Sequence, residues 1–129
     1  MTQRPGLYIM EGKHGRGVYT SEDIEAGALI ELCPVIVLNP KDTGQIHETH
    51  LHDYYFIWDI EQKSSAIALG YGSLYNHSSD PNAEYENDYD ENVIRFTALK
   101  HIPAHHEILI HYNAGGSNEY GIWFDDSSE

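Results

Sequence analysis

The stretch NHSSDPN, residues 76–82, is the most informative part of the sequence. Its second half, Asp80-Pro81-Asn82, predicts a turn, because proline fixes φ and both of its neighbours favour turns. The glycine-spaced run GYGSLY, residues 70–75, comes directly before it. Asn76 and His77 could cap loop amides at such a turn or contact a ligand, and the stretch by itself leaves both open.

Short apolar segments alternate with turn signals on both sides of this stretch. Aromatic and β-branched residues spread along the chain predict a sheet-rich fold rather than a helical bundle. Only short helical turns are expected, around 74–75 and within the polar stretch 42–52. The predicted strands and apolar segments, two of which flank Pro34, cover 7–10, 17–20, 29–32, 35–38, 54–58, 65–69, 93–97 and 107–110.

The composition is that of an acidic chain with enough apolar residues for a core. Its 129 residues suit one ordinary domain, and 40% of them are hydrophobic. Seven Lys and Arg stand against 21 Asp and Glu, for a formal net charge of −14. Such a surface repels nucleic-acid phosphates and attracts basic proteins, although a charge that serves only solubility would look the same.

The sequence predicts neither a membrane span nor a disulfide framework. No apolar run approaches the roughly 20 residues that a span requires, and Cys33 is the single cysteine. The first residues lack an apolar secretory segment. We therefore expect a cytoplasmic protein, or a nuclear one in a eukaryotic or viral setting, without direct contact with nucleic acid or membrane.

Two further segments carry residues that suit a ligand site. HGRGV, residues 14–18, has glycines one residue apart, which let a backbone come close to a ligand but equally form a plain turn. EILIHYN, residues 107–113, is a predicted strand followed by Tyr112 and Asn113. A tyrosine at a strand end is usually a core or rim residue, so this segment alone does not decide its role.

The order of the three segments resembles the SET-domain family of protein lysine methyltransferases. Gly-x-Gly comes early, Asn-His-Ser-x-x-Pro-Asn in the middle and Glu-Ile-x-Ile-x-Tyr late, so the likeness runs from about residue 7 to residue 112. Minimal single-domain viral and microbial members are the most similar. The resemblance implies a mainly β SET fold of small curved sheets, with a knot-like crossing of the middle and late segments. A single SET domain is expected over 1–129, with its core at about 7–113 and an aromatic tail at 114–129.

The resemblance also implies the reaction and the residues that carry it. Members transfer a methyl group from S-adenosylmethionine to a lysine of a protein, here expected to be basic, such as a histone or a histone-like protein. Tyr112 is expected at the point of methyl transfer. The residues expected to bind the cofactor are Gly15, Arg16, Gly17, Asn76, His77 and Trp123. Those expected to line the lysine channel are Tyr71, Tyr85, Ile110 and Tyr120.

These residue types suit methyl transfer to an amine. Lysine has an ordinary pKa of about 10.4 and arrives charged. A nearby positive sulfonium and desolvation in an aromatic channel both lower that pKa, so a strong dedicated base is not required. A tyrosine hydroxyl and backbone carbonyls can then orient the neutral amine, and tyrosine rings attract the approaching ammonium.

The sequence departs from the family pattern near the last strand. His111 stands where Asp is common, and His105-His106-Glu107 replaces a common Gly-Glu. Ile110 stands where an aromatic residue often limits the number of methyl groups. The smaller side chain would leave room for more than one methyl group unless Tyr85 fills the same space. These changes bear on the number of methyl groups more than on the reaction.

Other interpretations stay open beside this one. A non-catalytic SET module that binds a protein partner would bind the cofactor without methylating any protein. Histidines in 47–52 and 101–111 could suggest metal ligands, but their spacing fits common zinc signatures poorly, and we expect no metal site. A homodimer is expected through the strand 35–38 or the aromatic tail, because either would otherwise expose an apolar patch. The tail is also expected to close over the cofactor and the lysine channel.

Overall fold

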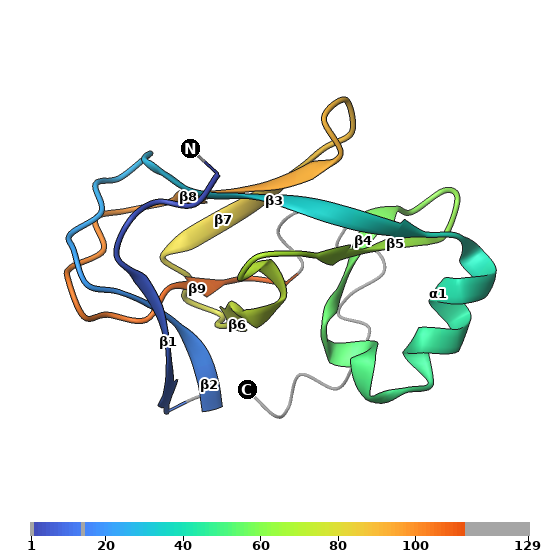
Figure 1. The fold of residues 1–129 in the computed structure, drawn as a ribbon, viewed down its shortest axis with the longest axis horizontal. Coiled ribbons are helices and arrows are strands. Elements are labelled where there is room, and N and C mark those ends of the chain that lie inside the picture. The colour runs from blue at the N-terminus through green and yellow to red at the C-terminus, as the bar shows by residue number, and fades with distance from the viewer. Residues whose placement is uncertain (1, 14, 113–129) are drawn as a thin grey trace.

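β3 (Leu29–Leu38) is the longest strand and the axis of the fold (Figure 1). The structure is a computed structural model that describes residues 2–13 and 15–112. β3 lies at the centre of a five-stranded antiparallel sheet in the order β4-β5-β3-β8-β7. Its neighbours are β4 (Tyr55–Asp59), β5 (Ser64–Ala68), β7 (Ala83–Asp88) and β8 (Val93–Ala98). The predicted mainly β architecture of small curved sheets is confirmed.

β3 changes partner at Pro34. Residues up to Pro34 pair with β8, and residues from Val35 onward pair with β5. Proline has no N–H to donate, so a strand can pass through it where its ladder moves from one neighbour to the other. The Pro34 carbonyl accepts from the Leu69 N–H at 2.9 Å. The two apolar segments predicted on either side of Pro34 are therefore halves of one strand.

β7 is a strand that the sequence did not predict. Its sequence, AEYEND, buries Ala83 and Tyr85 and exposes Glu84 and Glu86. Buried and exposed residues alternate regularly with a period of two. The strand was missed because the acidic residues at the exposed positions make the segment look like a polar loop. The exposed glutamates keep one face of the strand in solvent.

The end of β7 and the turn after it cover the opposite edge of the sheet. The Asn87 side chain donates to the Ile57 carbonyl at 3.0 Å, and the Tyr89 hydroxyl donates to the Trp58 carbonyl at 2.7 Å. These bonds occupy carbonyls of β4, an edge strand whose backbone groups would otherwise need solvent or another chain. The main sheet is therefore curved, with its two edges joined by side chains.

α1 (Pro40–His47) is an eight-residue helix at the end of β3. The Asn39 side chain accepts from the Asp42 N–H at 2.8 Å, and Pro40 occupies the first turn, where no N–H is needed. A 3-10 turn, η1 (His50–Asp53), follows. The sequence predicted only short helical turns within 42–52, and this was wrong in extent because the Asn39-Pro40 pair starts a longer helix.

In the described part of the chain, two smaller sheets lie beside the main one (Figure 1). β1 (Leu7–Gly12) and β2 (Gly15–Thr20) form an antiparallel hairpin at the side of the molecule away from α1. After the 3-10 turn η2 (Gly72–Leu74), β6 (Asn76–His77) pairs in parallel with β9 (Leu109–Ile110). β9 is shorter than the predicted strand 107–110, because Glu107 instead forms an isolated bridge with Tyr19.

Asn82 ties the middle segment to the late one. Its Nδ2 donates to the Glu107 carbonyl at 2.8 Å, and its Oδ1 accepts from the Leu109 N–H at 2.8 Å. Its backbone N–H donates to the Leu109 carbonyl at 3.1 Å, and its carbonyl accepts from the Leu99 N–H at 2.9 Å. The turn that follows β6 is thereby held across β9.

The buried core runs beneath the main sheet to the β6–β9 pair. Residues from both regions share one hydrophobic cluster, so the sheet and the crossing stabilise one another. Within the described residues, no helix is long and apolar enough to cross a membrane. The fully buried apolar members of the cluster are Val18, Ile24, Ile30, Cys33, Ala66, Ile94, Phe96, Ile102, Ile108 and Ile110.

Candidate active site

Asn76, His77 and Tyr112 lie together at the β6–β9 pair. His77 pairs with Ile110, the last residue of β9. The Tyr112 N–H donates to His77 Nδ1 at 3.1 Å, and the two ring centroids are 5.0 Å apart. Because Nδ1 accepts this bond, the neutral His77 ring carries its proton on Nε2. The structure thus brings together three residues that the sequence singled out in two separate motifs.

The Tyr112 side chain is held against a backbone oxygen. Its hydroxyl donates to the Tyr75 carbonyl at 3.1 Å, and the Tyr85 hydroxyl donates to the Tyr112 carbonyl. Burial, followed by the negative charge of Asp53, raises the pKa of Tyr112 above its ordinary value of 10.0. Tyr112 is therefore a neutral phenol near pH 7, which can orient an amine but does not act as a base.

Asn76 connects the β1–β2 hairpin to the late segment. Its Nδ2 donates to the Arg16 carbonyl at 3.0 Å and to Glu107 Oε2 at 2.8 Å. Both hydrogens of this amide are bonded within the protein, so Oδ1 is the atom of the side chain that can accept from a ligand. Arg16 and Asn76, both predicted to bind the cofactor, are therefore bonded to each other across a gap of 60 residues.

Gly17 is a glycine because other side chains occupy the space next to it. A Cβ there would lie 2.1 Å from Glu107 Oε2 and 2.7 Å from Asn76 Nδ2. Gly15 differs, since its φ of +86° requires glycine and a Cβ would meet only Glu11 Oε2, at 3.8 Å. Both glycines were predicted to let the backbone approach a cofactor. For Gly17, the close approach in the structure is to the Asn76–Glu107 pair.

Glu107 is a site residue that the sequence did not predict. Its carboxylate accepts from Asn76, and burial together with this carboxylate raises the pKa of the Tyr19 hydroxyl. In the sequence Glu107 opens the late motif Glu-Ile-x-Ile-x-Tyr and ends HHE, which replaces a common Gly-Glu. The bonding partner of the Glu107 carboxylate, Asn76, is 31 residues away in the sequence, so no local pattern reveals the pair.

The predicted channel residues differ in their surroundings. Tyr85 is buried and its hydroxyl reaches the Tyr112 carbonyl, so it lies next to the expected point of methyl transfer. Tyr71 is half-buried against the core. Ile110 has no exposed surface and belongs to the core cluster. Tyr120 and Trp123, with the whole tail 114–129, lie outside the described residues.

Histidines of the stretch 47–52 bond to their neighbours. His47 Nδ1 is 2.7 Å from the Tyr55 hydroxyl, and His52 Nε2 is 3.0 Å from Asp53 Oδ1. In residues 2–13 and 15–112, no group of three or more His, Cys, Asp or Glu side chains is placed to hold a metal ion.

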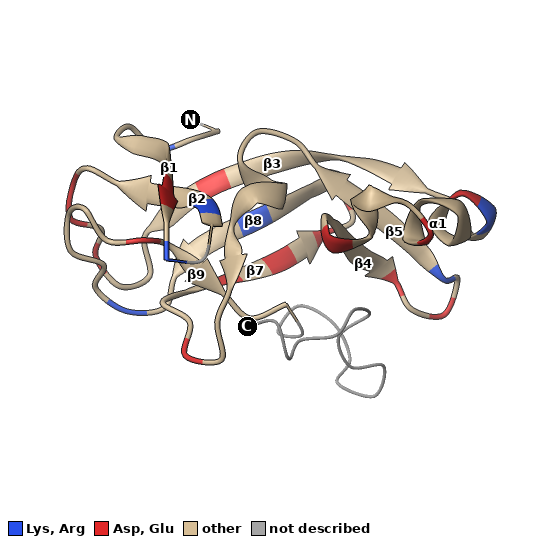
Figure 2. Ribbon diagram, turned by 90° about the horizontal axis from the view of Figure 1, so that it is seen from below, with Lys and Arg blue, Asp and Glu red and all other residues tan. Residues whose placement is uncertain are grey.

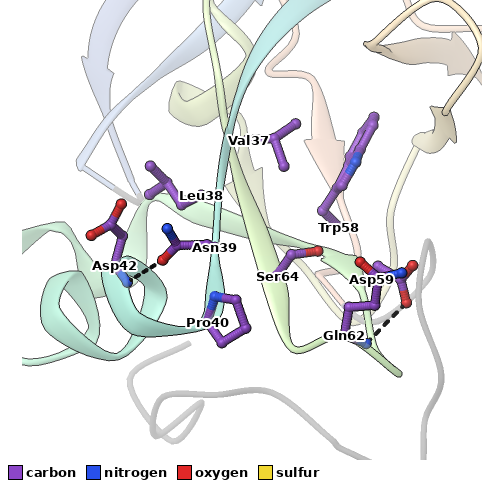
Figure 3. A pocket seen from close by; sticks show the side chains of 9 residues that line it. All are labelled: Val37, Leu38, Asn39, Pro40, Asp42, Trp58, Asp59, Gln62 and Ser64. Carbon is purple, nitrogen blue, oxygen red and sulfur yellow. Dashed lines mark hydrogen bonds between the residues drawn. The ribbon is translucent and has the colours of Figure 1, made fainter.

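A separate cavity of about 420 Å³ opens between the start of α1 and the β4–β5 loop (Figure 3). The Asn39 and Gln62 positions on its wall are held by the bonds Asp42 N–H to Asn39 and Gln62 N–H to Asp59. None of the predicted site residues lines it, so the candidate site stays at the β6–β9 pair. Its lining consists of Val37, Leu38, Asn39, Pro40, Asp42, Trp58, Asp59, Gln62 and Ser64.

Comparison with known proteins connects this geometry to one family. A sequence model of the SET domain matches residues 15–113, a range that includes the early glycines, the Asn76-His77 segment and Tyr112. The chain belongs to the SET-domain family. It is accordingly a protein-lysine methyltransferase.

Two relatives of this SET domain share about a third of its sequence. A histone-lysine N-methyltransferase of Schizosaccharomyces pombe, specific for lysine 37 of histone H3, is 32% identical over 117 residues, which cover 90% of this chain and 74% of the relative. The crystal structure of a candidate histone methyltransferase from Plasmodium falciparum is 32% identical, covers 88% of this chain and 96% of that chain, and has a TM-score of 0.69.

A more distant structure shares the fold of this SET domain. A chain of the ctPRC2 complex is 22% identical and has a TM-score of 0.72 over 92% of this chain. The match covers only 15% of that longer chain, so the likeness is between the fold of this SET domain and one part of that chain.

Proposed function

We propose that this SET domain transfers methyl groups from S-adenosylmethionine to lysine side chains of a basic protein of the histone class. The observation that carries the proposal is the bond from the Tyr112 hydroxyl to the Tyr75 carbonyl, beside His77. It holds two oxygen atoms 3.1 Å apart beside the β6–β9 pair. Oxygens fixed in this way can orient the lone pair of an amine and accept weak bonds from polarised methyl hydrogens.

The polar groups around Asn76 suit a ligand that carries charges of both signs. Glu107 offers a carboxylate, Asn76 offers its Oδ1, and the exposed Arg16 offers a guanidinium. The space beside Gly15 is open, since a Cβ there would meet only Glu11 Oε2, at 3.8 Å. We infer that these groups hold S-adenosylmethionine, which supplies an activated methyl group on its sulfonium.

Asn76→Ala should weaken the binding of S-adenosylmethionine about 10- to 100-fold, or roughly 1–3 kcal/mol. The substitution removes the accepting Oδ1 and leaves the Glu107 carboxylate without the amide that orients it. Isothermal titration calorimetry gives the Kd directly. Asn39→Ala is the matched control, because it removes only the cap of α1 and should lower stability by about 1 kcal/mol with no change in Kd. Unchanged affinity in folded Asn76→Ala would remove Asn76 from the cofactor site.

The charge of the chain supports a basic substrate. Figure 2 shows acidic positions along β7 and in loops at both ends of the main sheet. We expect acidic residues around the turn after β7 to contribute to this surface, and they differ in availability. Asp88 is paired with Arg95 at 2.9 Å, whereas Asp90 and Glu91 are exposed in the turn between β7 and β8. We propose that the unpaired acidic side chains attract the substrate.

The KM for a basic protein substrate should rise steeply with salt, while kcat changes much less. Attraction between exposed charges is screened beyond a Debye length of about 8 Å at physiological ionic strength, whereas the buried reaction site is screened less. Initial rates at two ionic strengths separate the two constants. A flat salt response would mean that the charge of −14 serves solubility alone.

The two relatives at 32% identity are described as histone methyltransferases, which supports a histone as the basic protein. In the direct test, the enzyme is incubated with labelled S-adenosylmethionine and a purified histone mixture. An acidic protein that contains lysine is the matched control. We expect label on histone lysines and little on the control. Equal labelling of both proteins, or labelling of neither, would contradict a histone-class substrate. A histone substrate also favours the nucleus between the two expected locations.

We propose that the outer half of β3 forms a homodimer contact. Ile36 is 50% exposed, and the neighbouring Leu69 is 43% exposed. Sedimentation at micromolar concentration should show a dimer, and Ile36→Asp should shift it to a monomer because a carboxylate there would be buried at the contact. A monomeric wild type, or an Ile36→Asp variant that still dimerises, would contradict this contact.

A further inference from the structure

The turn Tyr71–Tyr75 is pinned at both ends by one buried carboxylate. Glu31, on β3, is only 2% exposed. Its Oε2 accepts from the Tyr71 N–H at 3.0 Å, and its Oε1 accepts from the Tyr75 hydroxyl at 2.7 Å. A single side chain, 40 residues earlier in the chain, thus fixes where this turn begins and where it ends.

The surroundings of Glu31 suit a carboxylate that stays in place. The Gln3 side chain adds a third donor, with Nε2 at 3.0 Å from Oε2. Burial and the neighbouring carboxylate raise the pKa of the Cys33 thiol, so this close neighbour remains uncharged. Buried carboxylates are stable in proteins when donors satisfy their oxygens, and here every bonded partner is a donor.

The glycines of the run GYGSLY make room for this arrangement. A Cβ at Gly70, whose φ is +66°, would lie 2.3 Å from Glu31 Oε2. A Cβ at Gly72 would lie 2.9 Å from Cys33 Sγ. Both contacts are closer than side chains tolerate, so the spacing of the two glycines reflects close packing of the turn on β3.

The pinned turn carries the oxygen to which Tyr112 is bonded. The Tyr75 ring is 1% exposed and stacks on Phe96, with centroids 4.5 Å apart. The carbonyl of the same residue accepts from the Tyr112 hydroxyl at 3.1 Å. The contacts therefore run from Glu31 through Tyr75 to Tyr112 without a gap.

We propose that Glu31 is a positioning residue for methyl transfer, which acts through the Tyr71–Tyr75 turn and the Tyr75 carbonyl to place the Tyr112 hydroxyl. The proposal rests on the proposed function, in which Tyr112 is the residue at the point of methyl transfer. Glu31 itself does not touch the reacting atoms. Its effect should therefore disappear when the Tyr112 hydroxyl is absent, which a purely structural role would not do.

The test is a double-mutant cycle on kcat. Glu31→Gln keeps the shape but turns one oxygen into a donor facing other donors, so it should lower kcat about 10- to 100-fold by misplacing the turn. In the Tyr112→Phe background, the same substitution should change the remaining rate by less than about twofold, because coupled residues are non-additive. Tyr75→Phe keeps the ring and the carbonyl and should reproduce both results in milder form.

Ser65→Ala is the matched control for loss of stability. It breaks the buried hydroxyl pair of Thr43 and Ser65, 2.7 Å apart, which joins α1 to β5. It should lower Tm with kcat unchanged. Rates for all variants are compared well below their Tm values. If Glu31→Gln and Tyr75→Phe lower kcat by the same factor with and without the Tyr112 hydroxyl, the positioning role is overturned.

A spectroscopic readout tests the same link without turnover. The Cζ shift of Tyr112 in protein labelled with carbon-13 tyrosine should move in Glu31→Gln and Tyr75→Phe, and stay in place in Ser65→Ala. An unmoved shift in the first two variants would overturn the link. A wild type that methylates no protein would contradict the proposed function instead, so the two failures are distinct.

Discussion

Tyr112→Phe should give a folded protein that binds S-adenosylmethionine with wild-type affinity and has lost most of its turnover. The ring and its packing are kept, and only the hydroxyl that donates to the Tyr75 carbonyl is removed. Loss of one positioned polar group at a reacting centre costs about 100- to 1,000-fold in kcat. Single-turnover rates, together with the Kd from calorimetry, separate this effect from binding.

Tyr89→Phe is the control for this prediction. Its hydroxyl also donates to a backbone carbonyl, that of Trp58 at 2.7 Å, in a part of the sheet that the reaction does not use. It should leave kcat unchanged. Wild-type turnover in Tyr112→Phe would mean that Tyr112 is only a packing residue, and the site assignment would fail.

The pKa of Tyr112 fixes what its hydroxyl can do across the pH range. Burial raises this pKa above 10.0, so the neutral form is the one that folding favours. That contribution to stability is complete below the unfolded-state pKa of about 10 and is lost as the pH rises through the folded-state value. A rise of kcat/KM between about pH 7 and about pH 9 would therefore report the substrate amine rather than Tyr112.

Gly17→Ala should abolish most cofactor binding. The added Cβ would fall 2.1 Å from Glu107 Oε2 and 2.7 Å from Asn76 Nδ2, and those two groups are bonded to each other. They cannot both yield without breaking the bond that orients Asn76. We expect the Kd for S-adenosylmethionine to rise at least about 100-fold, the scale of losing a buried polar pair. Calorimetry measures the Kd, and circular dichroism confirms the fold.

Gly44→Ala shows what the same chemical change does without a clash. Gly44 lies in α1, and a Cβ there would meet nothing within 4 Å. The substitution should stabilise the protein by about 0.5–1 kcal/mol through helix propensity and leave the Kd unchanged. A folded Gly17→Ala variant with wild-type affinity would show that the Asn76–Glu107 pair is not part of the cofactor site.

The strands that the sequence predicted are those whose pattern is local. Val93 to Thr97 alternates clearly and forms β8. Pro34 appeared to separate two strands, but the structure carries one strand through it, because the change of partner requires no N–H at that position. β7 escaped prediction because glutamates fill its exposed positions. Where the extent of a strand depends on which neighbouring strand it pairs with, the sequence alone did not predict it.

For the site too, the sequence predicted residues that stand in local motifs and missed roles that depend on contacts with distant residues. Asn76, His77 and Tyr112 stood in recognisable motifs, and the structure brings them into contact. Glu31 stood in none of these motifs, and Glu107 opens the late motif but was not predicted to have a role, because each acquires its role through a partner 31 or more residues away. Their carboxylates look like ordinary surface charges in the sequence. Only the fold shows that one is buried and that the other is bonded to the Asn76 amide.

The most direct test of the central claim is transfer of a deuterated methyl group. The protein is incubated with histones and S-adenosylmethionine that carries the labelled methyl, and the histones are then analysed by tandem mass spectrometry. We expect labelled lysine side chains with the wild type and almost none with Tyr112→Phe. A wild type that binds the cofactor by calorimetry but labels no lysine in any basic protein would contradict the account, and would identify the chain as a binding module without turnover.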